Sequence, residues 1–299
     1  MRRAPCDGAC YSLVSKSGLT GTLDRGVLFA SIDNPPCNIM SVQMMADLTE
    51  LGQQIATDDS VRVLVLQSQD PDFFVAHFDT SVVIQKTIEG LPKRPRELSP
   101  LQAMCAGLRD NPKPSLVKIA GRAGGGGSEL ASSCDMRFGV RGRTLINQME
   151  VPLGLLPAAC GSQNLPRLMG RGRALEVILG GDDLDAETAE RWGYLNRIFD
   201  SIDDMNRFVD TLALRIAKWP PHAVALAKES VGNIDLPWRQ GLLDEQLLAA
   251  HAIRNPSTKR LLRKFMRLGA HTHDGEARMG GLLIEVADAV AAESEPPTH

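Results

Sequence analysis

The residues best suited to chemistry are two glutamates beside a run of four glycines. The run occupies 124–127, Glu129 follows it by two residues, and Glu150 comes 21 positions later. Carboxyl groups act as bases and acids in enzymes, and two that face one substrate can supply both functions. Glycines allow a ligand to approach the main chain closely, because they carry no side chain. We therefore expect the stretch from Lys118 to Gly154 to be the region that the rest of the chain positions.

The segments around the glycine run predict a strand, a turn and a helix. The apolar segment 115–120 follows Pro114 and is typical of a short buried strand. Residues 128–134 contain helix formers and no proline, so they predict a helix. The first N–H groups of a helix have no partner within it and attract negative charge. The charge bound there would be a phosphate or an oxyanion.

The phosphate alternative fits the sequence poorly. A nucleotide-binding loop places a lysine and a hydroxyl residue directly after its glycines, whereas Ser128 and the acidic Glu129 follow here. A dinucleotide site needs spaced glycines in a leading strand-helix-strand unit, and this run comes after the first third of the chain. The remaining alternative is a glycine-rich surface loop without a ligand.

The flanking sequence resembles the enoyl-CoA hydratase/isomerase (crotonase) superfamily. The similarity lies in KPSLVKIAGRAGGGGSELASSCDMRFG (113–139), in the block from MEVPLGLLP to YLNRIF (149–199), and in NPPCNIMS (34–41). Together these blocks cover most of residues 25–230 in the order that the family uses. The resemblance implies an α/β fold in which repeated ββα units form a superhelix, with a C-terminal helical region that mediates trimer or hexamer formation.

The resemblance also implies an active site for acyl-CoA chemistry. The backbone N–H groups of Gly126 and Phe78 would form an oxyanion hole for the thioester carbonyl, and Glu129 and Glu150 match the two glutamates of the hydratases. The residues implied in substrate binding are Ala76, His77, Asp79, Gly125 and Pro157. Coenzyme A is expected as part of the substrate, and neither a separate cofactor nor a metal is expected.

Two features depart from the family pattern. Ala76, His77 and Phe78 stand where the family has small residues, so the acyl pocket should be narrower or differently shaped. His77 is either an additional acid or base, since histidine titrates in the right range, or a residue that forms only a local hydrogen bond. The two glutamates are one position further apart than in the hydratases, and Met149 replaces the usual proline.

These observations favour a 2-enoyl-CoA hydratase that adds water across the double bond of a thioester. The alternatives are a double-bond isomerase, which can use a single glutamate, another acyl-CoA lyase or cyclase of the same fold, and a non-catalytic binding or scaffold protein. The crowded loop around His77 is the best support for the last alternative. The acyl chain and the choice between coenzyme A and an acyl-carrier arm stay open.

Composition excludes several classes of protein. The chain has 299 residues, of which 43% are hydrophobic and 23% charged, and its net charge is −3. This charge provides no attraction for nucleic acid or for an anionic membrane. No segment approaches the roughly 20 apolar residues of a membrane span, and the N-terminal residues lack an apolar signal region. We expect a cytoplasmic protein.

Possible metal ligands are few. Cys6 and Cys10 are spaced like half a zinc site, but no second pair follows, so the six cysteines are expected to be free thiols. The sequence His271-Thr272-His273 with Asp274 is either a metal site or, as we expect, a polar connection between C-terminal helices.

The remaining pattern alternates strands and helices until residue 200 and is helical afterwards. Strands are expected at 26–33, 62–67 and 195–199, and helices at 44–55, 99–109, 161–169, 173–179 and from 185. This alternation predicts an α/β core over residues 1–200 and a helical oligomerisation region over 201–299. Lys86, Lys93, Arg94 and Arg96 lie in a charged, proline-containing loop and would bind coenzyme A phosphates or simply face solvent.

Overall fold

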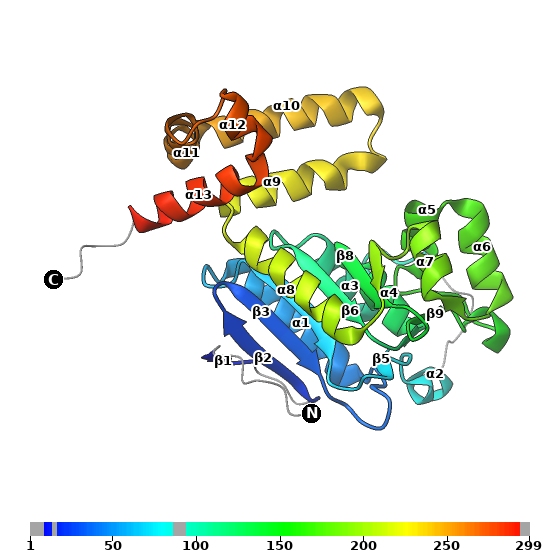
Figure 1. Cartoon of the computed structure of the whole chain (residues 1–299). Coiled ribbons are helices and arrows are strands. Elements are labelled where there is room, and N and C mark those ends of the chain that lie inside the picture. Colours follow the sequence, from blue (N-terminus) through cyan, green and yellow to red (C-terminus); the bar gives the residue numbers. More distant parts are fainter. Residues whose placement is uncertain (1–8, 14–16, 86–93, 294–299) are drawn as a thin grey trace. The chain divides into compact units, whose positions relative to one another are not determined.

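The computed structural model describes residues 9–13, 17–85 and 94–293. The chain forms two compact units, Met1–Ala213 and Leu214–His299. The first unit contains every described strand, and the second is built from helices, shown from yellow to red in Figure 1. The predicted limit of the α/β core, Asp200, lies within the first unit.

The larger sheet of the first unit has seven strands in the order β1-β2-β3-β4-β6-β8-β11. Their bounds are Ala9–Tyr11, Leu19–Asp24, Val27–Ile32, Val63–Ser68, Ser115–Ile119, Met136–Val140 and Arg197–Phe199. The β1, β2 and β3 strands are antiparallel, and the pairs from β3 to β11 are parallel. Every residue of β6 is buried, as expected for a parallel strand covered on both faces.

The smaller sheet has the order β10-β9-β7-β5, with strands Leu184–Asp185, Leu145–Asn147, Arg122–Gly124 and Phe73–Val75. Along the chain β4 is followed by β5, β6 by β7 and β8 by β9, and each second strand enters this smaller sheet. Helices follow each pair. This arrangement confirms the expected repeat of ββα units, and it brings the loops after β5, β7 and β9 to the same sheet.

The helices α1 (Val42–Thr57) and α3 (Pro100–Arg109) pack on each other. The predicted helix at 44–55 is confirmed, and its start is fixed by Ser41, whose Oγ accepts the N–H of Met44. Apolar side chains recur along one face of α1, so that face enters the core beside β3 and β4.

The first unit also contains the helices α2 (Thr80–Gln85), α4 (Gly126–Ser132), α5 (Gly161–Met169), α6 (Arg171–Gly180) and α7 (Ala186–Trp192). The predictions of α5, α6 and α7 are confirmed, and Asp185 caps α7 by accepting the N–H of Thr188. The helix α2 was not predicted; it is short and has no buried residue.

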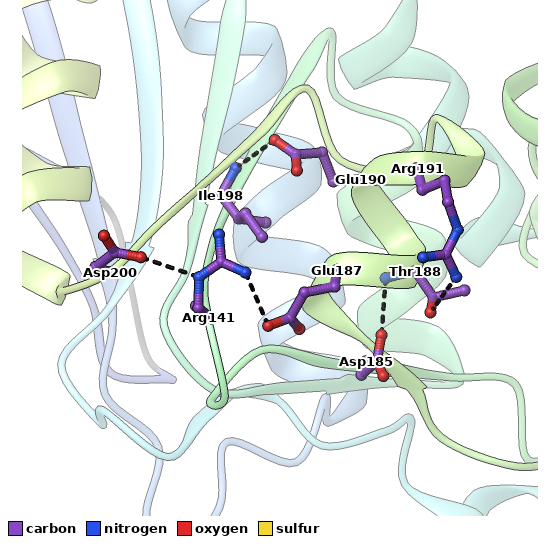
Figure 2. A network of polar contacts seen from close by, with 8 residues as sticks. All are labelled: Arg141, Asp185, Glu187, Thr188, Glu190, Arg191, Ile198 and Asp200. Atoms are coloured by element: carbon purple, nitrogen blue, oxygen red, sulfur yellow. Dashed lines mark hydrogen bonds and ion pairs between the residues drawn. The ribbon is translucent and has the colours of Figure 1, made fainter.

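Polar contacts connect α7 to the end of the larger sheet (Figure 2). Arg141, just after β8, donates from Nε to Asp200 Oδ1 at 2.9 Å and from Nη1 to Glu187 Oε1 at 3.1 Å. Glu190 Oε1 accepts the N–H of Ile198 at 3.1 Å. The ion pairs are exposed and screened by water, so they orient α7 more than they stabilise the fold.

The helix α8 (Ile202–Ala217) begins in the first unit and ends in the second. The other helices of the second unit are α9 (Pro221–Gly232), η2 (Asn233–Asp235), α10 (Trp238–Arg254), α11 (Pro256–Arg267), α12 (His273–Ala277) and α13 (Met279–Ala292). Within it, α9 packs on α10 and α11 on α13. The predicted all-helical C-terminal region is therefore confirmed. Among the described helices, none combines the length and apolar character needed to cross a membrane.

Candidate active site

The glycine run forms the junction between β7 and α4 (Gly126–Ser132). Gly124 is the last residue of β7, and Gly125 has φ 44°, a left-handed value that favours glycine. The N–H of Gly125 donates to Asn147 O at 2.9 Å, which joins the turn to β9. Gly126 and Gly127 already belong to the helix, so the turn is shorter than the four-residue glycine turn expected from the sequence.

The run lies directly against the segment that follows β5. A Cβ placed on Gly127 would lie 2.1 Å from Val75 O, and one on Gly124 would lie 2.5 Å from Ala76 O. Side chains are therefore excluded at both glycines by the backbone of the neighbouring loop. This close approach brings the main chain of the helix start to Phe78.

Two backbone amides, those of Gly126 and Phe78, lie near each other at this point. A Cβ on Gly126 would lie 3.2 Å from the amide nitrogen of Phe78 and 3.1 Å from its Cβ. Within the described part of the chain, neither the Gly126 nor the Phe78 amide donates a hydrogen bond. The Phe78 loop is held in place because Met40 donates to His77 O at 2.8 Å and Asp79 donates to Met40 O at 2.9 Å. Two fixed, unused donors of this kind can bind an oxyanion.

Glu129 is buried in the first turn and a half of α4, with 3% of its surface exposed. Its Oε1 accepts the backbone N–H of Ala159 at 2.7 Å and that of Gly161 at 2.9 Å. Burial raises the pKa of Glu129 to about 7, and the charge of Glu150 adds to the rise, while the two N–H groups oppose it. A carboxyl group that changes its protonation near neutral pH is suited to proton transfer.

Glu150 lies just after β9, at the start of the 3-10 turn η1 (Val151–Leu153). Its Oε2 is buried and has no hydrogen-bond partner among the described residues, although Glu150 as a whole is only half-buried. A Cβ placed on Gly125 would lie 2.9 Å from Glu150 Oε1, so the Glu150 carboxyl group lies directly beside this glycine. Burial raises the pKa of Glu150, and the charge of His77 acts in the opposite direction. The structure thus brings Glu150 close enough for its charge to raise the pKa of Glu129.

The residues expected to bind substrate border the same region. Ala76 is buried, and His77 and Asp79 are partly exposed in the loop before α2. Gly125 lies between this loop and Glu150. A Cβ placed on Gly125 would lie 3.6 Å from His77 Cβ and 2.9 Å from Glu150 Oε1. Pro157 is buried near the Glu129 carboxylate. A Cβ placed on Gly161 would lie 2.8 Å from Pro157 Cβ and 2.8 Å from Glu129 Oε1.

The sequence did not indicate that the backbone N–H groups of Ala159 and Gly161 would bind Glu129, nor that Cys160 would lie between them. Cys160 stands between the two donors, Ala159 and Gly161, and has φ 79° at the start of α5. The neighbouring Cys105 thiol lowers the pKa of the Cys160 thiol. The one sequence feature that could have indicated this contact is the run of small residues Ala158-Ala159-Cys160-Gly161, because small side chains let this segment approach α4 closely. Among the described cysteines, Cys10, Cys37, Cys105 and Cys160 are free thiols.

The other candidate sites lead to no assembled centre. Among the described residues, no group of three histidine, cysteine or acidic side chains is placed to hold a metal ion. Thr272 caps α12 through the N–H of Gly275, so the histidine segment serves as a connection between helices. Lys86, Lys93 and Cys6 lie outside the described residues, whereas Arg94 and Arg96 are exposed.

Comparison with known proteins identifies the family. Residues 22–265 match the family described as Enoyl-CoA hydratase/isomerase. The chain belongs to this family. Its members act on acyl-CoA thioesters, so the two glutamates and the two free amides lie in the fold of an acyl-CoA enzyme.

Individual relatives agree with this assignment. The chain is 30% identical over 212 residues to "Probable enoyl-CoA hydratase echA8" of Mycobacterium leprae, a match that covers 71% of this chain and 79% of the relative. Among solved structures, DspI of Pseudomonas aeruginosa is 29% identical with a TM-score of 0.77, covering 86% of this chain and 96% of DspI. An enoyl-CoA hydratase from Bacillus anthracis is 26% identical with a TM-score of 0.75, covering 84% and 96%.

Proposed function

We propose that this enzyme is a 2-enoyl-CoA hydratase. The proposal is carried by two glutamates, Glu129 and Glu150, that lie beside the two unused amides of Gly126 and Phe78, with the charge of Glu150 raising the pKa of Glu129. A hydratase needs a base for water, an acid for carbon and donors for the thioester oxygen. This site contains candidates for all three.

The reaction would begin with the thioester carbonyl oxygen accepting the N–H groups of Gly126 and Phe78. As water adds to the β-carbon, the double-bond electrons move toward the carbonyl, and negative charge develops on that oxygen. Donors fixed at the site of developing charge lower the barrier. Within the described residues these amides have no competing acceptor, so binding the substrate would break no hydrogen bond of theirs.

Proton transfer would divide between the two glutamates. One carboxylate removes a proton from water as the oxygen bonds to the β-carbon, and the other, protonated carboxyl gives its proton to the α-carbon. The net change is addition of one water, and proton exchange through solvent restores the starting state. No further cofactor is needed, because water is the co-reactant.

Substrate contacts would come from the residues around the two amides. Ala76, His77 and Asp79 border the acyl group from the loop after β5, whereas Gly125 and Pro157 border the glutamates. The bulk of His77 and Phe78 in this loop supports a restricted acyl pocket.

A substrate screen tests the proposal. The enzyme is incubated with 2-enoyl-CoA thioesters of graded acyl size, and both the conjugated absorbance and the product mass are followed. Hydration removes the absorbance and adds the mass of one water. Loss of conjugation at unchanged mass would instead identify an isomerase, and binding without any product would identify a non-catalytic member of the family.

A further inference from the structure

Cys160 has a backbone conformation that residues with a side chain rarely adopt. Its φ of 79° and ψ of −7° are left-handed values that favour glycine. The fold holds it there, because the N–H groups of Asn164 and Gln163 donate to Cys160 O at 2.7 Å and 2.9 Å. Strained residues of this kind are concentrated at functional sites, and this one carries a thiol.

A second thiol lies beside it. Cys105 is buried in α3 and belongs to the hydrophobic core, and the partly buried Cys160 packs against the same core. Groups at the end of α3 act on the Cys160 thiol: Cys105 and Arg109 lower its pKa, whereas burial and Asp110 raise it. The start of α5 therefore faces the last turn of α3, and this contact brings the two thiols together.

Helix α4, which carries Glu129, borders the same pair. Ser133, directly after α4, is a neighbour of the Cys105 thiol and donates from Oγ to Glu129 O at 2.8 Å. Asn164 of α5 donates from Nδ2 to Ser133 Oγ at 3.0 Å. The two thiols thus lie where α3, α4 and α5 meet.

The two thiols differ in reactivity. The neighbouring Cys160 thiol and burial raise the pKa of Cys105, whereas the pKa of Cys160 is lowered. Cys160 therefore ionises first, and it is also the more exposed of the two. Since the thiolate is the nucleophile, an oxidant reacts first with Cys160, and the adjacent Cys105 then closes the disulfide.

A bond between these thiols would act on Glu129. A disulfide is about 2.05 Å long, which is shorter than any contact between two separate thiols. Because Cys105 is fixed within a buried helix face, closing the bond draws Cys160 towards α3. Ala159 and Gly161, which flank it, hold Glu129 Oε1 through their N–H groups at 2.7 Å and 2.9 Å. A displacement of Cys160 therefore moves both donors.

We propose that Cys160 and Cys105 form a disulfide in the presence of a hydroperoxide, and that this bond withdraws the two amides that hold Glu129. The resulting loss of hydration rests on the proposed function, whereas the formation of the bond does not.

The oxidation takes place in two steps. The Cys160 thiolate attacks one peroxide oxygen, the O–O bond breaks, and a sulfenic acid forms while the leaving hydroxide takes up the thiol proton to become water. The Cys105 sulfur then bonds to the sulfur of the sulfenic acid, and the departing hydroxide takes the Cys105 proton. With hydrogen peroxide, two thiols give one disulfide and two water molecules, and the two electrons lost by sulfur are gained by the peroxide oxygens.

Peptide mapping of the full chain tests the bond. The reduced protein is treated with hydrogen peroxide, the remaining thiols are blocked with iodoacetamide, and the non-reduced digest is analysed by mass spectrometry. We expect a linked pair of peptides that contains Cys105 and Cys160. Absence of this pair, with Cys160 either unchanged or oxidised to the sulfinic acid, would overturn the inference.

Hydration of a 2-enoyl-CoA is followed in the same samples. A shift of about 1 Å in a catalytic group can cost on the order of 10²-fold in rate, so activity should fall by about that factor. Dithiothreitol should restore it, because it reduces a disulfide but not methionine sulfoxide. Cys160→Gly suits the left-handed backbone, keeps the N–H group and should lose the response to peroxide. Cys37→Ser, which removes another partly buried thiol, is the control and should respond like the wild-type enzyme.

Infrared spectroscopy provides a measurement that needs no turnover. The two N–H groups lower the pKa of Glu129, so their withdrawal should raise the pH at which its protonated C=O band disappears, the band being assigned by its absence in Glu129→Gln. If the disulfide forms and leaves both this midpoint and hydration unchanged, the inference fails and the hydratase assignment stands. If no thioester is hydrated but the disulfide moves the midpoint, the hydratase assignment fails and the coupling of the thiols to Glu129 stands.

Discussion

The Gly161 amide donates to Glu129 Oε1 at 2.9 Å, and a Cβ on the same glycine would lie 2.8 Å from that oxygen. The residue that holds the carboxylate thus also has no room for a side chain. A side chain on Gly161 could not turn away from Glu129 either, because the added Cβ would also lie 2.8 Å from Pro157 Cβ. The orientation of Glu129 consequently depends on a glycine outside its own helix.

Gly161→Ala should therefore displace the Glu129 carboxylate and reduce kcat. Misplacement of a catalytic group by about 1 Å can cost on the order of 10²-fold in rate. Steady-state kinetics would measure the effect, with Gly172→Ala in α6 as the matched control, since a Cβ there meets nothing within 4 Å. Equal activity of the two variants would show that the hydrogen bonds from Ala159 and Gly161 to Glu129 do not control catalysis.

The ionisation of Glu129 should make the stability of the protein depend on pH. Burial raises its pKa from 4.5 to about 7. Between these values the folded state keeps a proton that the unfolded state has lost, so this contribution to stability is complete below about 4.5 and is lost as pH rises to about 7. The difference is roughly 3 kcal/mol in the free energy of unfolding.

Urea unfolding at fixed protein concentration would measure this contribution at pH 5 and pH 8. Glu129→Gln cannot ionise, so the variant should gain stability relative to the wild-type protein between the two pH values. A constant difference between the two proteins would contradict the assigned pKa.

Loss of the Gly126 amide should reduce turnover. Gly126→Pro removes the N–H group, and loss of one oxyanion donor typically costs about 10²–10³ in kcat. Gly126→Ala is the matched control, because it adds a Cβ beside Phe78 and keeps the donor. Circular dichroism must show that both variants are folded. The proposed oxyanion hole is wrong if the proline variant is as active as the alanine variant.

The helical second unit should assemble with other copies of the chain. It exposes several large apolar side chains, among them Trp238 and Ile234 at 81% and Val231 at 73%. Exposed apolar surfaces of this kind are typical of subunit interfaces. Light scattering should report a trimer or hexamer, and Trp238→Asp should weaken it, whereas Gln240→Asp, also exposed, should not. An active wild-type monomer at micromolar concentration would exclude this assembly.

The fold was largely predictable where apolar periodicity extends over several turns. The buried face of α1 and the apolar run of β4 are examples, because their patterns are long enough to distinguish helix from strand. The strands β5, β7 and β9 have three residues each, too few for a period to be recognised. The β2 strand, LTGTLD, was missed because threonine, glycine and partial burial obscure its alternation.

Of the candidate site, only the side chains were predictable. Glu129 and Glu150 could be chosen from residue type and family resemblance, and the fold brings both to Gly125 and α4. The N–H groups of Ala159 and Gly161 could not be chosen, since every residue but proline carries one and only the start of α5 directs them at Glu129.

We propose that Glu129 and Glu150 both act on the same water molecule. The most direct test is hydration of a 2-enoyl-CoA in ¹⁸O-labelled water by the wild-type enzyme, Glu129→Gln and Glu150→Gln, with the product mass measured over time. The account predicts a product carrying one ¹⁸O from the wild-type enzyme, and a loss on the order of 10²–10⁴-fold in each variant, because each removes a group that transfers a proton. Undiminished ¹⁸O incorporation by a folded Glu150→Gln or Glu129→Gln variant would contradict the two-carboxylate mechanism.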